Sequence, residues 1–284
     1  MDADDNAAER AFWNGPQGQS WVANQAALDA LHSGVTELLL AETAARAGAR
    51  LLDIGCGAGA TTLAFARAVG PAGSVTGVDI SEPLLGLARA RAEAEDVANA
   101  TFLHADAAHH RFDPGSVDQV VSRFGLMFFA NPPAALATIG AALRPGGAIV
   151  FVTWAGLAEN PWFALPLAAA VARLGPPEPA DPDAPGPMAF RDIGRITGIL
   201  SAAGFAEAEG EVHAVDLHLP GGLDAACALA LRIGAASRLI RDKGGDEGDA
   251  AAIAADLRVR LAPFVSVDGI RVPAAVNVFR ARRF

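Results

Sequence analysis

The sequence predicts an α/β fold with a mostly parallel sheet and helices on both of its faces. Short runs rich in Val, Ile and Leu alternate with longer, alanine-rich stretches through the middle of the chain, as in repeated strand-helix units. Glycine and proline stand between many of these runs and mark turns. A chain of 284 residues can bury a substantial core. We therefore expect one large domain with helical insertions.

The first part of the chain is predicted to alternate strands and helices. Strands are expected at residues 50–54, 74–79, 101–104, 118–122 and 148–154, and helices at 60–69, 83–94 and 132–143. Ser81 and Asn131 precede helices with proline in the first turn, so both are expected to be N-caps. The turn Arg144-Pro145-Gly146-Gly147 is expected to end the third helix and lead into the fifth strand.

The second part is predicted to complete the same sheet. Residues 175–187 contain so many prolines that they can form neither helix nor strand, and we expect a stiff, exposed connection there. After it we expect a helix at 192–203, an alternating strand at 211–219, two helices on either side of the polar loop 243–249, and a last strand at 274–280.

The composition excludes several classes of function. A formal charge of −10 without a basic stripe disfavours nucleic-acid substrates. Cys56 and Cys227 are too few for a disulfide framework or a thiolate metal site, so no metal is expected. Pro166 and Arg123 interrupt the longest apolar stretches, which predicts no membrane span. The acidic start at residues 1–5 is unlike a secretion signal, and we expect a cytoplasmic protein of undetermined oligomeric state.

A glycine-rich turn is the strongest functional signal. Asp53-Ile54-Gly55-Cys56-Gly57-Ala58-Gly59 ends a predicted strand and opens a helix, so the backbone can approach a ligand closely there. Asp79 closes the next strand, where a carboxylate can accept hydrogen bonds from two ribose hydroxyls. Together these features predict an adenosine-containing ligand.

The turn alone does not identify which adenosine ligand binds. Gly55, Gly57 and Ala60 also match the dinucleotide fingerprint, which keeps a nicotinamide-dependent oxidoreductase as an alternative. Asp53 would repel a pyrophosphate but attract the ammonium and sulfonium groups of S-adenosylmethionine, and no basic residue is expected nearby to neutralise phosphate. A non-catalytic binding module is a further alternative, because fold does not fix function.

Several motifs in order resemble the class I S-adenosylmethionine-dependent methyltransferases: Leu51 to Gly59, Val78-Asp79-Ile80-Ser81 and Ala105-Asp106-Ala107. Ser122 to Phe129 and Leu143 to Gly147 resemble the small-molecule group that includes quinone-biosynthesis C-methyltransferases. The similarity runs from about Trp13 to Phe205. It implies S-adenosyl-L-methionine as cofactor and a Rossmann-like, seven-stranded sheet with an antiparallel final strand and a helical cover.

The resemblance also implies roles for individual residues. Asp53, Gly55 and Gly57 would line the methionine and ribose portion, Asp79 would hold the ribose, Ile80 would pack on the adenine, Asp106 and Ala107 would meet its amino group, and the backbone of Ser122 to Phe124 would face the methionine. Asp106 could instead form only an Asx turn. Arg123 ends an apolar strand, so its charge needs a partner such as a carboxylate on the cofactor, the acceptor or the protein.

Methyl transfer from a sulfonium is an in-line displacement in which positioning can supply most of the acceleration. An oxygen or carbon acceptor would gain from a general base, for which His32 is the candidate, with a surface or capping histidine as the alternative. The residues expected in the acceptor pocket are aromatic or soft, and core packing is their alternative role: Trp13, Trp21, Phe124, Met127, Trp154 and Trp162.

The predicted domains follow from this arrangement. We expect residues 1–48 to form an N-terminal helical cover and residues 49–284 to form the methyltransferase domain, with cover insertions near 155–190 and 223–265. A small, apolar or aromatic acceptor would lie between the sheet and this cover.

Overall fold

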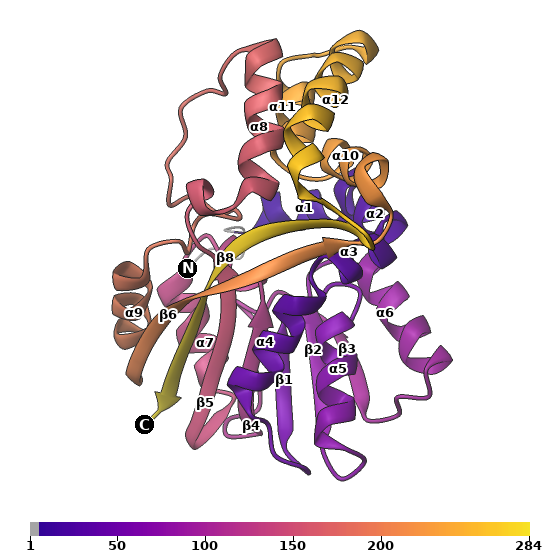
Figure 1. Cartoon of the computed structure of the whole chain (residues 1–284). Coiled ribbons are helices and arrows are strands. Elements are labelled where there is room, and N and C mark those ends of the chain that lie inside the picture. Colours follow the sequence, from indigo (N-terminus) through magenta and orange to yellow (C-terminus); the bar gives the residue numbers. More distant parts are fainter. Residues whose placement is uncertain (1–5) are drawn as a thin grey trace.

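One sheet forms the centre of the protein, with strand order β3-β2-β1-β4-β5-β8-β6 and a short β7 paired to β8 (Figure 1). This computed structural model describes residues 6–284, and the acidic start at residues 1–5 lies outside them. The strands are β1 (Arg50–Ile54), β2 (Ser74–Asp79), β3 (Ala100–His104), β4 (Val117–Arg123), β5 (Leu143–Trp154), β6 (Phe205–Leu219), β7 (Val265–Ser266) and β8 (Gly269–Arg283).

The predicted fold class is confirmed. Strands β1 to β5 pair in parallel, and β8 runs antiparallel to both β5 and β6. Seven strands lie on the main path of the sheet, as expected, and the two-residue β7 adds an eighth beside β8.

Helices cover both faces of the sheet. α4 (Ser33–Thr43) and α5 (Ala60–Val69) pack on one face, and α7 (Pro132–Gly140) and α9 (Ile193–Ala202) pack on the other. α6 (Glu82–Ala94) joins β2 to β3 and lies on the side of α5, because successive parallel crossovers in one direction are right-handed. β1 lies between β2 and β4, so the strand order reverses there and opens a crevice at the carboxyl ends, where ligands bind in such sheets.

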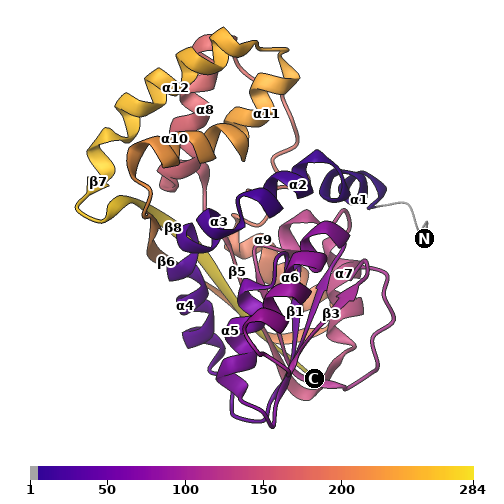
Figure 2. The ribbon, with the colours of Figure 1, turned by 90° about the vertical axis from the view of Figure 1, so that its right-hand side faces the viewer.

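Two groups of helices lie beyond the carboxyl ends of the strands. α1 (Ala7–Asn14), α2 (Pro16–Ala23) and α3 (Gln25–Leu31) cross directly above the sheet, between it and a second group (Figure 2). That group consists of α8 (Pro161–Leu174), α10 (Gly222–Arg232), α11 (Ala235–Asp242) and α12 (Glu247–Leu261). None of the helices within residues 6–284 combines the length and apolar character needed to cross a membrane.

Two local expectations are confirmed and two were wrong. Asn131 caps α7, since its side chain accepts a hydrogen bond from the Ala134 amide. Ser81 occupies the N-cap position of α6, as predicted, although its hydroxyl donates to the Trp13 carbonyl and makes no capping hydrogen bond. Residues 144–147 belong to β5 as an irregularity in its pairing with β4, and α7 already ends at Gly140. The first of the two helices expected around residues 243–249 is broken at Gly234 into α10 and α11.

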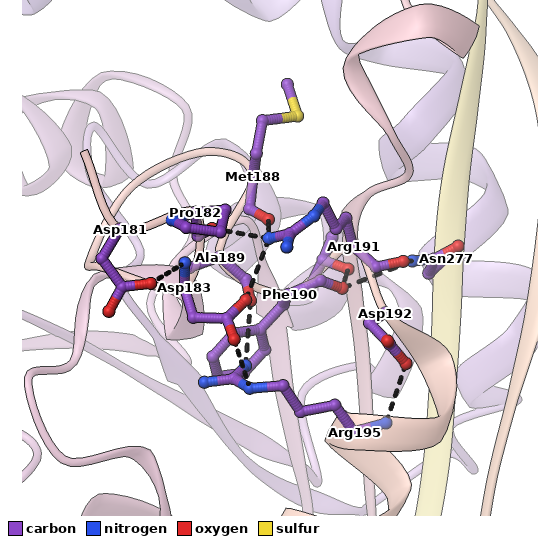
Figure 3. Close-up of polar contacts among 11 residues, drawn as sticks. Asp181, Pro182, Asp183, Met188, Ala189, Phe190, Arg191, Asp192, Arg195 and Asn277 are labelled. Atoms are coloured by element: carbon purple, nitrogen blue, oxygen red, sulfur yellow. Dashed lines mark hydrogen bonds and ion pairs between the residues drawn. The ribbon is translucent and has the colours of Figure 1, made fainter. Parts of the chain in front are cut away.

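The proline-rich connection is exposed and forms neither helix nor strand, as predicted. Its end is held by two arginines that point at one aspartate (Figure 3): Asp183 lies 3.0 Å from Arg191 and 3.2 Å from Arg195. Asn277 of β8 donates a hydrogen bond of 3.0 Å to the Arg191 carbonyl. The connection is therefore anchored to the sheet at one end while its proline-rich middle remains exposed.

Candidate functional site

Three glycines of the turn after β1 have left-handed backbones, with φ of +68° at Gly55, +53° at Gly57 and +83° at Gly59. A Cβ at Gly55 would lie 2.6 Å from Gly125 Cα, and one at Gly59 would lie 3.2 Å from the Phe102 ring. A Cβ at Gly57 would meet nothing within 4 Å. Packing explains Gly55 and Gly59, and Gly57 is the turn glycine that faces open space.

Gly125 is expected to tolerate no side chain. A Cβ there would lie 2.8 Å from Gly55 Cα and would also meet the Ile54 carbonyl. Gly125→Ala should lower the free energy of unfolding by about 2 kcal/mol through overpacking, measured by urea denaturation. Gly86→Ala is the control, because a Cβ at this helical position meets nothing within 4 Å, and it should stabilise by about 0.5 to 1 kcal/mol. Equal effects of the two changes would contradict the glycine-glycine contact.

Asp53 lies behind the turn. It is fully buried, and its Oδ2 accepts hydrogen bonds of 2.6 Å from the hydroxyls of Thr61 and Thr62 in the first turn of α5. Its Oδ1 has no hydrogen-bond partner within residues 6–284. Burial raises the pKa of Asp53 to about 6, although the threonine hydroxyls oppose this. Only Oδ1 is left to accept a further hydrogen bond.

Asp79 ties the turn to the next helix. Its Oδ2 accepts a hydrogen bond of 2.7 Å from the Gly57 amide, and its Oδ1 accepts one of 2.8 Å from the Ser81 amide. Burial raises the pKa of Asp79, and these amides act against the rise. Each carboxylate oxygen keeps a lone pair, so Asp79 can accept further hydrogen bonds beside Gly57.

The end of α1 is fastened to the β2–α6 loop. Asn14 donates a hydrogen bond of 2.8 Å to the Ile80 carbonyl and accepts one of 3.0 Å from the Glu82 amide. The Asn14 side chain therefore makes the capping hydrogen bond at the start of α6 that the Ser81 side chain does not make. Ser81 donates 2.7 Å to the Trp13 carbonyl. No sequence pattern pointed to Asn14, because this residue is far from the loop along the chain.

The Asp106 carboxylate accepts hydrogen bonds from Asn6, the N-cap of α1, and from its own turn. Asn6 Nδ2 lies 3.0 Å from both carboxylate oxygens, and the Ala108 amide donates to Oδ1 at 3.0 Å in an Asx turn. Burial raises the pKa of Asp106, but the hydrogen bonds from Asn6, His109 and Ala108 outweigh it and hold the pKa below its usual value. Ala107 is buried. Sequence reasoning missed Asn6.

Arg123 and Arg91 bring positive charge to the turn. Arg123 donates 2.6 Å to the Thr36 hydroxyl; burial lowers its pKa, and the carboxylates of Asp29 and Asp53 act against this. Arg91 of α6 donates 2.7 Å to the Ala58 carbonyl and pairs with Asp29 at 2.8 Å. The expectation that no basic residue lies near the turn was therefore wrong, although Asp29 offsets the charge of Arg91.

Ser122 fixes the strand end beside Arg123. It is buried, and its hydroxyl donates 2.7 Å to the Ile54 carbonyl and accepts 3.1 Å from the Gly125 amide. These bonds join the end of β4 to the end of β1.

An aromatic group stands at the ends of β4 and β5. The rings of Phe124 and Trp154 stack with centroids 4.1 Å apart and planes 9° apart, and His32 lies 5.5 Å from Phe124 and 5.8 Å from Trp154. The ring centroid of Phe163, in α8, lies 4.9 Å from that of Trp154. Burial, followed by the Arg123 charge, lowers the pKa of His32 to about 3. His32 is therefore neutral at pH 7.

The remaining predicted pocket residues fall into two sets. Trp13 and Trp21 form an edge-to-face pair 5.4 Å apart, and Trp21 Nε1 is buried without a partner within residues 6–284. Met127 and Trp162 are buried at 1% and 8% exposure and belong to the hydrophobic core, as does Trp154 at 3%. The structure thus brings His32, Phe124 and Trp154 together, and Phe124 is the one of these three that is not buried.

Part of the chain is similar in sequence to known methyltransferases. Residues 51–147 match the family model described as a methyltransferase domain. The chain is 37% identical over 105 residues to demethylmenaquinone methyltransferase of Staphylococcus aureus (strain JH9), a match that covers 37% of this chain and 43% of that protein. The matched part is thus less than half the length of this relative.

Solved structures share the fold. The YcgJ protein from Bacillus subtilis aligns with a TM-score of 0.56 at 18% identity, over 89% of this chain and 99% of that chain. Phosphoethanolamine N-methyltransferase 2 from Haemonchus contortus, in complex with S-adenosyl-L-methionine, aligns with a TM-score of 0.59 at 19% identity, over 96% of this chain and 59% of that chain. Residues 51–147 therefore match a methyltransferase domain, and the solved structures share the fold of the wider chain.

Proposed function

We propose that the protein transfers the methyl group of S-adenosyl-L-methionine to a small-molecule acceptor. The observation that carries this proposal is the open space over Gly57, flanked by the Asp79 carboxylate that holds the Gly57 amide. A ribose fits such a place, because its two hydroxyls are donors and the carboxylate is an acceptor without donors of its own. The domain match over residues 51–147 supports the same cofactor.

The residues present fit a cationic nucleoside. Asp53 offers a buried, unpartnered oxygen, and burial strengthens its interaction with a positive charge. In this proposal Asp79 holds the ribose, Asp53 acts on the ammonium group, and Arg123 binds the carboxylate of the amino-acid tail. Asp106 and Ile80 lie at the adenine end, where Asn6 contacts Asp106. When bound, S-adenosylmethionine supplies a methyl group activated by a sulfonium, ready for in-line displacement.

The acceptor side is apolar and aromatic. Phe124, Trp154 and His32 supply planar rings beside the strand ends, which suits an apolar or aromatic acceptor. A histidine whose pKa is about 3 is a weak base at neutral pH, so we propose that His32 positions the acceptor as a neutral imidazole. The name of the matched Staphylococcus aureus relative, demethylmenaquinone methyltransferase, is compatible with an aromatic acceptor of quinone type.

The cofactor is tested by calorimetric titration with S-adenosylhomocysteine and with NAD. The first should bind and the second should not. Tighter binding of NAD would replace the proposal by the oxidoreductase alternative. Transfer of labelled methyl from S-adenosylmethionine to a panel of phenols, quinols and amines then tests turnover, and binding without any transfer would favour a non-catalytic module.

A further inference from the structure

Phe124 has a backbone conformation that bulky side chains disfavour. Its φ is +66°, in the left-handed region that costs free energy for residues other than glycine. The other non-glycine residues with positive φ in the described chain are Ala44, Asp96 and Glu207. Ala44 is the C-cap of α4, Asp96 follows the end of α6, Glu207 lies in the bulge of β6, and all three are exposed. Phe124 alone is partly buried and packed against the core.

The surroundings hold this conformation from both sides. The Phe124 amide donates a hydrogen bond of 2.9 Å to the Val152 carbonyl of β5. The next residue, Gly125, is packed against Gly55 and bonded through its amide to the Ser122 hydroxyl. The backbone at Phe124 therefore cannot relax into an extended conformation without breaking the contact between β4 and the glycine turn.

The conformation determines where the ring lies. The Phe124 ring stacks on Trp154 with planes 9° apart and meets His32 at its edge, while Trp154 is also contacted by Phe163 of α8. The aromatic stack thus runs from α8 toward the glycine turn, and Phe124 is its member next to Gly125, which touches Gly55. Phe124 as a residue is half-buried, whereas Trp154 and His32 are buried, so Phe124 is the member of this group that a ligand can reach.

We propose that Phe124 is a specificity-determining residue whose strained backbone fixes its ring as a platform for a planar aromatic acceptor beside the glycine turn. Strain in a partly buried residue persists only where the structure over-determines it, and it concentrates at ligand sites. A planar acceptor would extend the stack of Phe124 and Trp154 in the offset geometry that aromatic rings favour. The inference rests on the proposed function, because it assigns the acceptor of that same site.

The test uses two probes of equal skeleton, 1-naphthol and its saturated analogue decahydro-1-naphthol, titrated into the protein with S-adenosylhomocysteine present. The wild type should prefer the planar probe by about tenfold, the scale of one aromatic stacking contact. Phe124→Trp should keep this preference. Phe124→Leu, which keeps apolar bulk, and Phe124→Gly, which keeps the backbone conformation, should both lose it. S-adenosylhomocysteine should still bind all three variants, because only the backbone of Phe124 is expected to face the methionine.

A structural role alone would give a different pattern. Glycine accepts positive φ freely, so Phe124→Gly loses the strain as well as the ring. Ala44→Gly at the exposed C-cap of α4 measures strain release without removing a polar contact, as a rise in Tm of about 2 to 4 °C. Phe124→Gly that keeps the planar preference, or that loses it together with S-adenosylhomocysteine binding, would overturn the proposal. A wild type that binds S-adenosylhomocysteine without preferring 1-naphthol would overturn it and leave the proposed function intact. A wild type that prefers 1-naphthol but does not bind S-adenosylhomocysteine would overturn the proposed function instead.

Discussion

Asp79→Ala is expected to weaken the binding of S-adenosylhomocysteine by about 3 kcal/mol, roughly 150-fold. The carboxylate holds the amides of Gly57 and Ser81 at 2.7 and 2.8 Å and, in the proposed function, also accepts from the ribose. Alanine would remove the acceptor and leave the amides of Gly57 and Ser81 without a hydrogen-bond partner in the protein. Calorimetric titration of wild type and variant measures the difference directly.

Two further variants define what a loss means. Asp118→Ala is the control, because Asp118 pairs with Arg50 and Arg144 near the beginning of β4, at the opposite end of the strands, and its loss should leave affinity unchanged. Asp79→Asn keeps one oxygen but turns an amide donor toward backbone donors, so an intermediate loss of affinity for S-adenosylhomocysteine is expected.

The affinity should also depend on pH. Since burial raises the pKa of Asp79, binding of S-adenosylhomocysteine should weaken on acidification at a higher pH than an ordinary aspartate would give. Full affinity in Asp79→Ala would remove Asp79 from the ribose site.

The regular part of the fold was predictable because its signals are local. The bounds of β1, β2 and α5 agree with the sequence prediction. An apolar run, a glycine turn and an alanine-rich helix can each be recognised from a few consecutive residues. β6 begins at Phe205, well before the expected alternating segment at 211–219. Its added length comes from pairing with β8, which includes a bulge at Glu207 and depends on residues far along the chain.

The site was predictable only where a single segment builds it. Gly57 and Asp79 belong to consecutive strand ends, so their spacing in the sequence predicts their meeting. Asn6, Asn14 and Arg91 reach the same region from α1 and α6, and no local pattern distinguishes them from surface residues. The strain at Phe124 is likewise invisible in the sequence, because it results from contacts between the ends of β1, β4 and β5.

On acidification, His32 and Asp53 are expected to change the free energy of unfolding in opposite directions. The pKa of His32 falls from 6.5 to about 3 on folding, so the unfolded chain binds more protons between these values. The contribution of His32 to the free energy of unfolding is fully present above pH 6.5. It is lost as the pH falls, by about 3 kcal/mol between pH 7 and pH 4. The pKa of Asp53 rises from 3.8 to about 6, so folding takes up a proton in that window, and stability increases on acidification from pH 7 to pH 4 by about 2 kcal/mol.

Urea denaturation at pH 7 and pH 4 separates the two effects, because the other carboxylates are common to every variant and cancel in the comparison. His32→Phe, which keeps a ring beside Phe124 and Trp154, should gain about 3 kcal/mol relative to the wild type on going from pH 7 to pH 4. Asp53→Asn should lose about 2 kcal/mol over the same interval. Because the two shifts have opposite signs, the double variant should follow the wild type to within about 1 kcal/mol. A His32→Phe variant whose stability changes with pH as the wild type does would show that folding does not lower the pKa of His32, which would contradict a buried imidazole that stays neutral on acidification.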